Sequence, residues 1–299
     1  MINVILSLLE KQKGIRVEKN LPASRLTSFR IGGPISYVVY PRTIEALVSC
    51  LVSVRGAGIP FRIVGCGTNL LARDEGYPGI WFVTRDMKEI RIQKTRAEVL
   101  CGVTLRALVD TAARVGLGGM ENLFGIPGTV GGAVMMNAGA YGTSTGDLVE
   151  NVTVFDLWRE KILSFSFDDC RFGYRKSVFQ EGRYVILSAE FRLTPSREDL
   201  IRATMRRLTE SRAASQPLEY PNAGSIFRRP VGAFAGKLIS DAGLRGYRMG
   251  DIQVSEKHCG FFVNRGSGTA RDVKQLISFV QERVFDTSGV VLRPELVME

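Results

Sequence analysis

Two glycine-bearing segments have the composition of phosphate-binding loops. The longer one extends from Gly125 to Gly142 and contains Ile126, Pro127, Gly128, Thr129, Gly131, Gly132, Asn137, Gly139 and Tyr141. The shorter one is Gly65-Cys66-Gly67-Thr68-Asn69-Leu70. Glycine lets the backbone approach a ligand closely, and free N–H groups in such a loop can form a nest for an anion. We therefore expect two rigid loops around a phosphate-bearing cofactor; the alternative is a tightly packed crossover.

The common nucleotide-binding motifs do not account for these loops. A Rossmann fingerprint needs Gly-x-Gly-x-x-Gly, but Leu70 stands where the third glycine of the shorter loop is required. A Walker A loop needs Ser or Thr after Gly-Lys, but Leu238 follows Gly236-Lys237. The cofactor is therefore expected in a different fold.

Composition narrows the class of protein. The chain has 299 residues, 45% of them hydrophobic, and a net charge of +10, which favours anionic ligands. No basic tail or interleaving of basic and aromatic residues suggests nucleic acid. No apolar run is long enough for a membrane span, and Met1 to Glu10 lacks the features of a signal peptide. We therefore expect a cytoplasmic protein without membrane insertion. A monomer is also expected.

Metal and disulfide chemistry receives no support from the sequence. The five cysteines have no metal-ligand or redox spacing, and His258 is the single histidine. We expect reduced, mostly buried thiols and no metal site.

Hydrophobic periodicity and capping residues predict the elements that must position the loops. In the first half, strands are expected at 36–40, 61–64, 80–84, 89–93, 97–101, 151–156, 161–166 and 184–193, the last as an edge or closing strand, with helices after Thr43 and over 104–115. In the second half, capping boxes at Ser196 and Thr269 predict two helices, with a short helix near 233–243 and a strand near 289–292. Pro195 marks the boundary, so we expect an α+β protein with domains 1–194 and 195–299.

Seven short motifs in order make the chain resemble a known family. They are Thr27 to Pro34, Gly65 to Leu71, Ile126 to Gly142, Gly173 to Ser177, Asn222 to Phe227, Val254 to His258, and Arg293 to Glu295. This set is similar to the UDP-N-acetylenolpyruvoylglucosamine reductase (MurB) family, within the vanillyl-alcohol oxidase-like flavoproteins. The short spacing from Arg175 to 184–193 resembles the second, shorter type of this family. The resemblance implies an FAD-binding domain of the PCMH type, followed by a smaller α/β substrate-binding domain.

The resemblance also implies an activity and its cofactors. FAD would be bound without a covalent link by the residues named in the two loops, NADPH would donate the hydride, and a UDP-sugar would be the substrate. Its enolpyruvyl ether would be reduced to a lactyl ether during peptidoglycan precursor synthesis. The shorter loop's Cys66 could be a covalent flavin attachment site, but a small buried side chain is the favoured interpretation.

Matching positions imply the residue roles. Arg175 would bind the substrate carboxylate, Ser225 would donate a proton to the substrate, and Glu295 would hydrogen-bond the developing aci-carboxylate. Tyr141, Arg212, Gln216 and Arg228 would contact the substrate. Taken alone, Arg175 could be a surface ion-pair partner, Ser225 a turn residue and Glu295 a solvated residue near the terminus.

Three other functions are alternatives to this one. The first is a flavin-dependent alcohol oxidase of the same fold. The second is a serine hydrolase using Ser225 and His258, although the residues around Ser225 lack the Gly-x-Ser-x-Gly elbow. The third is a basic binding protein without enzymatic activity. Bound flavin would exclude the last two.

Overall fold

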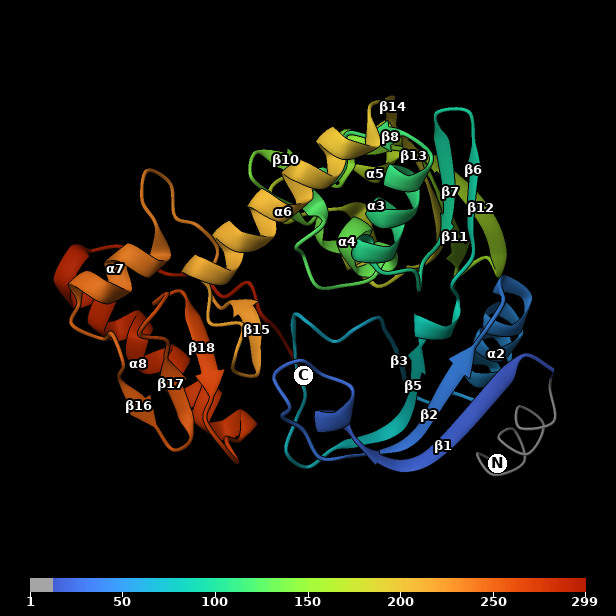
Figure 1. The fold of residues 1–299 in the computed structure, drawn as a ribbon. Coiled ribbons are helices and arrows are strands. Elements are labelled where there is room, and N and C mark those ends of the chain that lie inside the picture. The colour runs from blue at the N-terminus through green and yellow to red at the C-terminus, as the bar shows by residue number, and fades with distance from the viewer. Residues whose placement is uncertain (1–12) are drawn as a thin grey trace. The chain divides into compact units, whose positions relative to one another are not determined.

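A computed structural model describes residues 13–299 as two compact units (Figure 1). Unit 1 consists of residues 13–19, Tyr37–Cys66 and Gly79–Glu210. Unit 2 consists of Asn20–Ser36, Gly67–Pro78 and Ser211–Glu299. The units differ from the expected division at 194/195, because two early segments group with the C-terminal part. Within residues 13–299, no helix combines the length and hydrophobicity that crossing a bilayer takes.

The first half of the chain contains two larger sheets, two strand pairs and four α-helices before the long helix α6. The four-stranded sheet has the order β1 (Ile15–Pro22), β2 (Pro34–Pro41), β5 (Tyr77–Val83), β3 (Phe61–Val64). The five-stranded antiparallel sheet has the order β12 (Lys161–Ser166), β11 (Val149–Asp156), β13 (Tyr184–Arg192), β7 (Arg96–Leu100), β6 (Ile90–Gln93). The short pairs are β8 (Leu117–Gly118) with β14 (Thr194–Pro195), and β9 (Gly139–Ala140) with β10 (Thr143–Ser144). The helices are α2 (Ile44–Gly56), α3 (Leu105–Arg114), α4 (Val130–Met136), α5 (Phe167–Cys170) and α6 (Glu198–Ser215).

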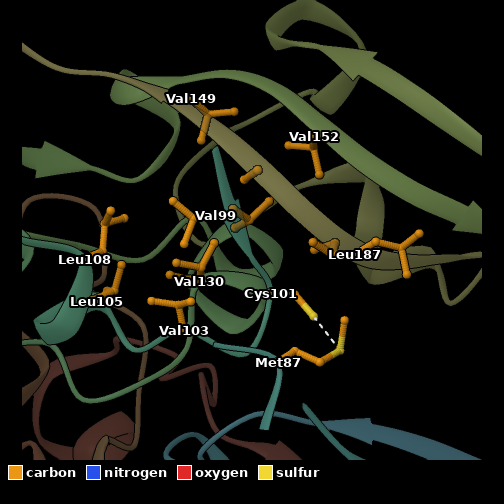
Figure 2. Packing of buried hydrophobic residues seen from close by; sticks show 14 of the residues in the cluster. Met87, Val99, Cys101, Val103, Leu105, Leu108, Val130, Val149, Val152 and Leu187 are labelled. Atoms are coloured by element: carbon orange, nitrogen blue, oxygen red, sulfur yellow. Dashed lines mark hydrogen bonds between the residues drawn. The ribbon is translucent and has the colours of Figure 1, made fainter. Parts of the chain in front are cut away.

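Unit 1 has a continuous apolar core. Figure 2 shows part of it, where Val99, Val130, Val149 and Val152 pack together and the Cys101 thiol lies 3.8 Å from the Met87 sulfur. The core includes apolar residues of α2, α3 and both larger sheets, so it fixes the elements that carry the longer glycine loop.

Unit 2 is a sheet with two helices and an added strand pair. The sheet order is β15 (Asn222–Ser225), β18 (Phe261–Asn264), β17 (Ile252–Val254), β16 (Arg248–Met249), and α7 (Ala235–Asp241) and α8 (Ala270–Ser288) lie beside it in Figure 1. The parallel pair is β4 (Leu70–Leu71) with β19 (Val297–Met298). Its core joins Phe29, Ile31 and Leu71 to residues of the C-terminal segment.

Short 3-10 turns complete the described chain. Their bounds are η1 (Ala23–Arg25), η2 (Thr84–Asp86), η3 (Glu121–Leu123), η4 (Gly146–Leu148) and η5 (Val178–Glu181).

Local capping chemistry accounts for the helix starts that the sequence predicts correctly. The hydroxyls of Thr43 and Thr104 accept hydrogen bonds from the N–H groups three residues onward. Thr269 and Asp272 form the complete capping box of α8. The predicted box at Ser196 is wrong, because α6 begins at Glu198, one residue later than a cap at Ser196 requires.

Two strand predictions are also wrong. β13 lies at the centre of its sheet rather than at an edge, because it pairs with β11 on one side and with β7 on the other; its residues Val185, Ile186, Leu187, Ala189 and Phe191 are all buried. No strand forms at 289–292, where Gly289 ends α8 in the left-handed conformation; the terminal strand is β19 instead.

Candidate functional site

The longer glycine loop contains a helix that its composition argues against. Residues Val130–Met136 form α4, with the Thr129 hydroxyl as N-cap and Val130 and Val134 in the unit 1 core. Tertiary packing thus overrides the low helix propensity of Gly131 and Gly132. The expectation of a purely irregular loop was wrong.

The N–H groups at the start of α4 are bonded within the chain. Their acceptors are Val103 O for Val130 N (2.7 Å), Cys101 O for Gly131 N (2.8 Å), and Thr129 Oγ1 for Gly132 N (3.3 Å). These three N–H groups are therefore not free to form an anion nest. Gly131 is explained by packing, since a Cβ there would lie 3.0 Å from the Cys101 Cβ.

The two glycine loops touch within unit 1. A Cβ on Gly65 would lie 2.2 Å from the Thr129 Oγ1, which is closer than any side chain tolerates. Gly65 therefore permits the close approach of the shorter loop to the N-cap of α4. Both residues belong to the set that the family resemblance assigns to FAD, and that assignment stays a prediction.

Three further residues of the longer loop are fixed by its backbone. Gly128, with φ +156°, accepts a hydrogen bond from Leu105 N at 3.1 Å, and Ile126 N donates to Leu123 O at 3.0 Å. Pro127 lies between them. The loop is thus tied at both sides of Pro127, as the expectation of a rigid loop requires.

The shorter loop continues from unit 1 into unit 2 between Cys66 and Gly67. Gly67 has φ +60°, and a Cβ there would lie 2.5 Å from Leu26 O. Thr68 follows it. Burial raises the pKa of the Cys66 thiol, and the nearby Arg85 only partly offsets this. A protonated thiol is a poor nucleophile, which agrees with the expectation of non-covalent flavin.

Within unit 2, the end of the shorter loop lies beside the C-terminal segment. The Asn69 Nδ2 donates to the Glu295 carbonyl at 3.2 Å, and Val297 N donates to Asn69 O at 3.1 Å. Leu70 then pairs with Val297 in the β4–β19 ladder. A predicted flavin segment and a predicted catalytic residue are therefore neighbours.

Ser225 and Glu295 are brought together by the same segment. Glu295 N donates to the Ile226 carbonyl at 2.8 Å, and Phe227 forms a β-bridge with Pro294. Gly224, with φ +76°, lies within an irregular stretch of β15, and the Ser225 side chain is exposed there. An exposed hydroxyl and a half-buried carboxyl group thus share one edge of unit 2.

Arg175 is held by its own side chain in unit 1. Its Nη1 donates to the Asn137 carbonyl at 3.4 Å and its Nη2 to the Gly139 carbonyl at 3.1 Å. The residue has φ +52°, in a tight turn where Gly173 and Lys176 form a bridge. The two carbonyl dipoles orient the cation.

Tyr141 lies in the two-residue turn between β9 and β10. Tyr141 and Gly142 both have positive φ, +52° and +83°, as a type I′ hairpin requires. The tyrosine ring is 47% exposed, and its hydroxyl lies 3.5 Å from the Leu208 carbonyl of α6.

The other predicted substrate residues lie in unit 2. Arg212 is at the end of α6, where its carbonyl accepts from Gln216 N at 2.9 Å. The Gln216 Oε1 is buried and accepts no hydrogen bond from any described residue. Arg228 is exposed, and its N–H bonds the Arg293 carbonyl at 2.8 Å. Their contact with substrate stays a prediction.

His258 is not arranged as a general base for Ser225. Its Nδ1 accepts a hydrogen bond from Gly260 N at 3.1 Å, and burial lowers its pKa. Among the described residues, no hydrogen bond joins it to Ser225. The serine hydrolase alternative lacks the required nucleophile–base pair.

Two polar residues that fix the Arg175 turn were not among the residues predicted from the sequence. The Ser177 hydroxyl donates to the Met135 carbonyl at 2.6 Å. The Gln180 Nε2 donates to the same carbonyl and to the Arg175 carbonyl, both at 3.1 Å. Ser177 was visible in the motif around Arg175, whereas Gln180 carried no sequence signal.

Comparison with known proteins identifies both parts of the chain. Residues 35–166 match the family model of an FAD-binding domain, and residues 216–298 match the C-terminal domain of UDP-N-acetylenolpyruvoylglucosamine reductase. Proteins of that name from Agathobacter rectalis and Caldicellulosiruptor saccharolyticus are 41% and 42% identical, over 98% and 93% of this chain and 96% and 90% of theirs.

A solved structure agrees with these matches. The Thermus caldophilus UDP-N-acetylenolpyruvylglucosamine reductase (MurB) has a TM-score of 0.81 and 33% identity, covering 95% of this chain and 99% of its own. The expected α+β fold and FAD dependence are confirmed, and a basic protein without enzymatic activity is excluded. The chain belongs to the UDP-N-acetylenolpyruvoylglucosamine reductase family.

Proposed function

We propose that this protein reduces the enolpyruvyl ether of UDP-N-acetylenolpyruvoylglucosamine to UDP-N-acetylmuramate, in peptidoglycan precursor synthesis. The observation that carries the proposal is the backbone pairing of the Ser225 strand with the segment of Glu295. A proton donor and a carboxyl group on one edge suit a reaction in which a carboxylate-conjugated C=C gains a hydride and a proton. An alcohol oxidase would need neither group.

FAD, once bound by the residues of the two glycine loops, would supply the redox chemistry, with NADPH as the hydride source and C3 of the substrate as the hydride acceptor. The residues of this chain must then stabilise charge and deliver a proton. The buried contact of Gly65 with Thr129, and the backbone bonds on both sides of Pro127, provide rigid loops for a flavin. They support the cofactor assignment without specifying which N–H groups meet its diphosphate.

Arg175 is proposed to bind the substrate carboxylate. Addition of hydride at C3 places negative charge on C2 and on the conjugated carboxylate, so a permanent cation at that carboxylate lowers the barrier. A guanidinium binds a carboxylate through two parallel hydrogen bonds and never loses its charge. The Asn137 and Gly139 carbonyls fix its orientation before substrate arrives.

Ser225 is proposed to protonate C2, with Glu295 hydrogen-bonding the developing aci-carboxylate. A hydroxyl is a weak acid in water, but an enolate-like carbon is a strong base, so a positioned hydroxyl suffices. Exposure of Ser225 in the irregular stretch of β15 leaves its hydroxyl accessible to a substrate. Tyr141, Arg212, Gln216 and Arg228 are proposed to hold the UDP-sugar.

A single-turnover experiment tests the function. The purified protein is reduced with NADPH under anaerobic conditions, and the flavin absorbance is followed after addition of UDP-N-acetylenolpyruvoylglucosamine. The expected result is stoichiometric reoxidation of flavin, with one UDP-N-acetylmuramate formed per flavin. Flavin that stays reduced with this substrate, yet reoxidises with oxygen, would contradict the proposal. UDP-N-acetylglucosamine, which lacks the enolpyruvyl group, is the control.

A further inference from the structure

Asn137 joins three segments of unit 1 through one buried side chain. It is 7% exposed and ends α4 in the left-handed conformation, with φ +42°. Its Nδ2 donates to the Gly173 carbonyl at 2.9 Å, and its Oδ1 accepts from Gly146 N at 2.8 Å. The amide thus donates a hydrogen bond to one segment and accepts one from another. A side chain that can only donate or only accept cannot make both bonds.

The segment that Asn137 holds is the turn of Arg175. Gly173 begins that turn, and its N–H and carbonyl both bond Lys176, at 3.0 and 3.1 Å. Arg175 lies between them and donates back to the Asn137 carbonyl. The side chain of Asn137 therefore fixes the turn, and its backbone receives the guanidinium, so the two residues close a ring of contacts.

The contact between Gly146 and the amide requires a residue without a side chain at position 146. A Cβ on Gly146 would lie 2.8 Å from the Phe172 ring and 3.0 Å from the Asn137 Oδ1. Glycine at 146 therefore allows its N–H to reach the amide oxygen. A buried polar network that is fully paired rigidifies its surroundings, whereas a partly paired one loosens them.

We infer that Asn137 is a positioning residue for the reduction, acting through Arg175 rather than as a flavin ligand. The inference rests on the proposed function, because it assumes that Arg175 binds the substrate carboxylate. The Arg175 guanidinium is oriented for carboxylate binding only while the Asn137 amide is hydrogen-bonded to both Gly173 and Gly146. Under this inference, Asn137 would act on Arg175 instead of making the FAD contact that the family resemblance predicts.

Two substitutions test the amide, one nearly isosteric and one that removes the whole side chain. Asn137→Asp keeps the acceptor for Gly146 N but turns a carboxylate oxygen toward the Gly173 carbonyl. Asn137→Gly keeps the left-handed backbone without strain and removes both contacts, so it serves if the aspartate variant fails to fold. Asn151→Asp, at an exposed position of β11, is the matched control.

The expected result separates the two half-reactions. Asn137→Asp and Asn137→Gly should keep their FAD and be reduced by NADPH within about twofold of the parent rate, because Arg175 has no role in that step. Reoxidation by the enolpyruvyl UDP-sugar should slow about tenfold, because one or two of the hydrogen bonds that hold the Arg175 turn are lost. Asn151→Asp should match the parent in both. Loss of flavin from both Asn137 variants would overturn the inference, because Asn137 would then be a flavin ligand.

A double-mutant cycle shows whether Asn137 acts through Arg175. Reoxidation is measured for Arg175→Ala, Asn137→Asp and the double variant. The inference predicts that the double variant is no slower than Arg175→Ala, within about twofold. Multiplicative losses would overturn it and leave the role of Arg175 intact. If Arg175→Ala is reoxidised at the parent rate, Arg175 does not bind the substrate carboxylate as proposed, and both that role and the inference are contradicted.

Discussion

The two units hold their candidate catalytic residues in opposite ways. In unit 1, the Arg175 side chain is bound by two carbonyls and its turn is tied to the buried Asn137 amide. In unit 2, Ser225 and Glu295 are fixed through their backbones, and the exposed Ser225 hydroxyl makes no hydrogen bond within the described chain. A cation that must meet a carboxylate gains from being oriented beforehand, whereas a proton donor must keep its hydroxyl available.

The largest effect should come from Ser225→Ala, which tests the unit 2 side of the comparison. Reoxidation by substrate should slow about 10³-fold, because the proton donor is lost, while reduction by NADPH stays at the parent rate. The exposed side chain makes the substitution structurally silent, so the thermal melting curve should not move. Stopped-flow absorbance and circular dichroism measure the two effects.

Ser278→Ala, on the exposed face of α8, is the control for the serine substitution. It should leave both half-reactions unchanged. Parent-like reoxidation of Ser225→Ala would mean that another group protonates the substrate.

Asp156→Asn should destabilise unit 1 by about 3 kcal/mol, because it breaks a buried ion pair. The fully buried Asp156 accepts from the Arg183 guanidinium at 2.5 Å and from Trp158 N at 2.9 Å. An amide would present a donor to the guanidinium. Hydrogen exchange read by mass spectrometry should show faster exchange in β11 to β13 and unchanged exchange in β17 and β18. Equal acceleration in both units would show that they unfold together.

The same pair predicts an acid dependence. Hydrogen bonding to Arg183 lowers the pKa of Asp156 to about 2. Because the folded pKa is below the unfolded one, this contribution is complete above about pH 4 and is lost as the pH falls toward 2. Urea unfolding between pH 5 and pH 2 should show this loss in the parent and in Asp168→Asn, an exposed control, but not in Asp156→Asn. A parallel decline in all three proteins would contradict the assignment.

Arg175→Lys tests whether carboxylate binding in unit 1 needs the planar guanidinium group or only a positive charge. An ammonium cannot bind two carbonyls and a carboxylate in one plane, so reoxidation by substrate should slow about 30-fold. Arg159→Lys, at an exposed hairpin turn, is the control. Transient kinetics with and without substrate measure the change, and a rate within twofold of the parent would leave only a charge requirement.

The smallest effect should come from Asp74→Ala, at the start of α8 in unit 2. Asp74 accepts from Ala270 N at 2.8 Å and from Arg271 N at 3.1 Å, so its removal should cost about 1 kcal/mol of unfolding free energy. Both half-reactions should persist, since α8 carries no proposed catalytic group. Glu75→Ala is the neighbouring control, and equal stability of the two variants in urea would refute the capping role.

Local chemistry made much of the fold predictable. The cap at Thr43, the capping box at Thr269 and the helix over 104–115 depend only on near neighbours, and the structure confirms them. The central place of β13 and the occupied N–H groups of α4 depend on partners far along the chain, which spacing cannot reveal.

The candidate site depended on resemblance more than on spacing. Nothing in the sequence alone links Ser225 to Glu295, and the family motifs supplied that link. The role inferred for Asn137 was out of reach, because it requires the positions of Gly146 and Gly173 in space.

The composition of the unit 2 core has a consequence for the order of synthesis. Phe29 and Ile31 leave the ribosome long before their partners near the C-terminus, and the Asn264 side chain bonds the Phe29 carbonyl across 235 residues. Such sequence-distant contacts slow folding and leave apolar side chains waiting in the nascent chain. Unit 2 can therefore complete this core only after its last segment has been synthesised, and until then Phe29 and Ile31 lack their partners from that segment.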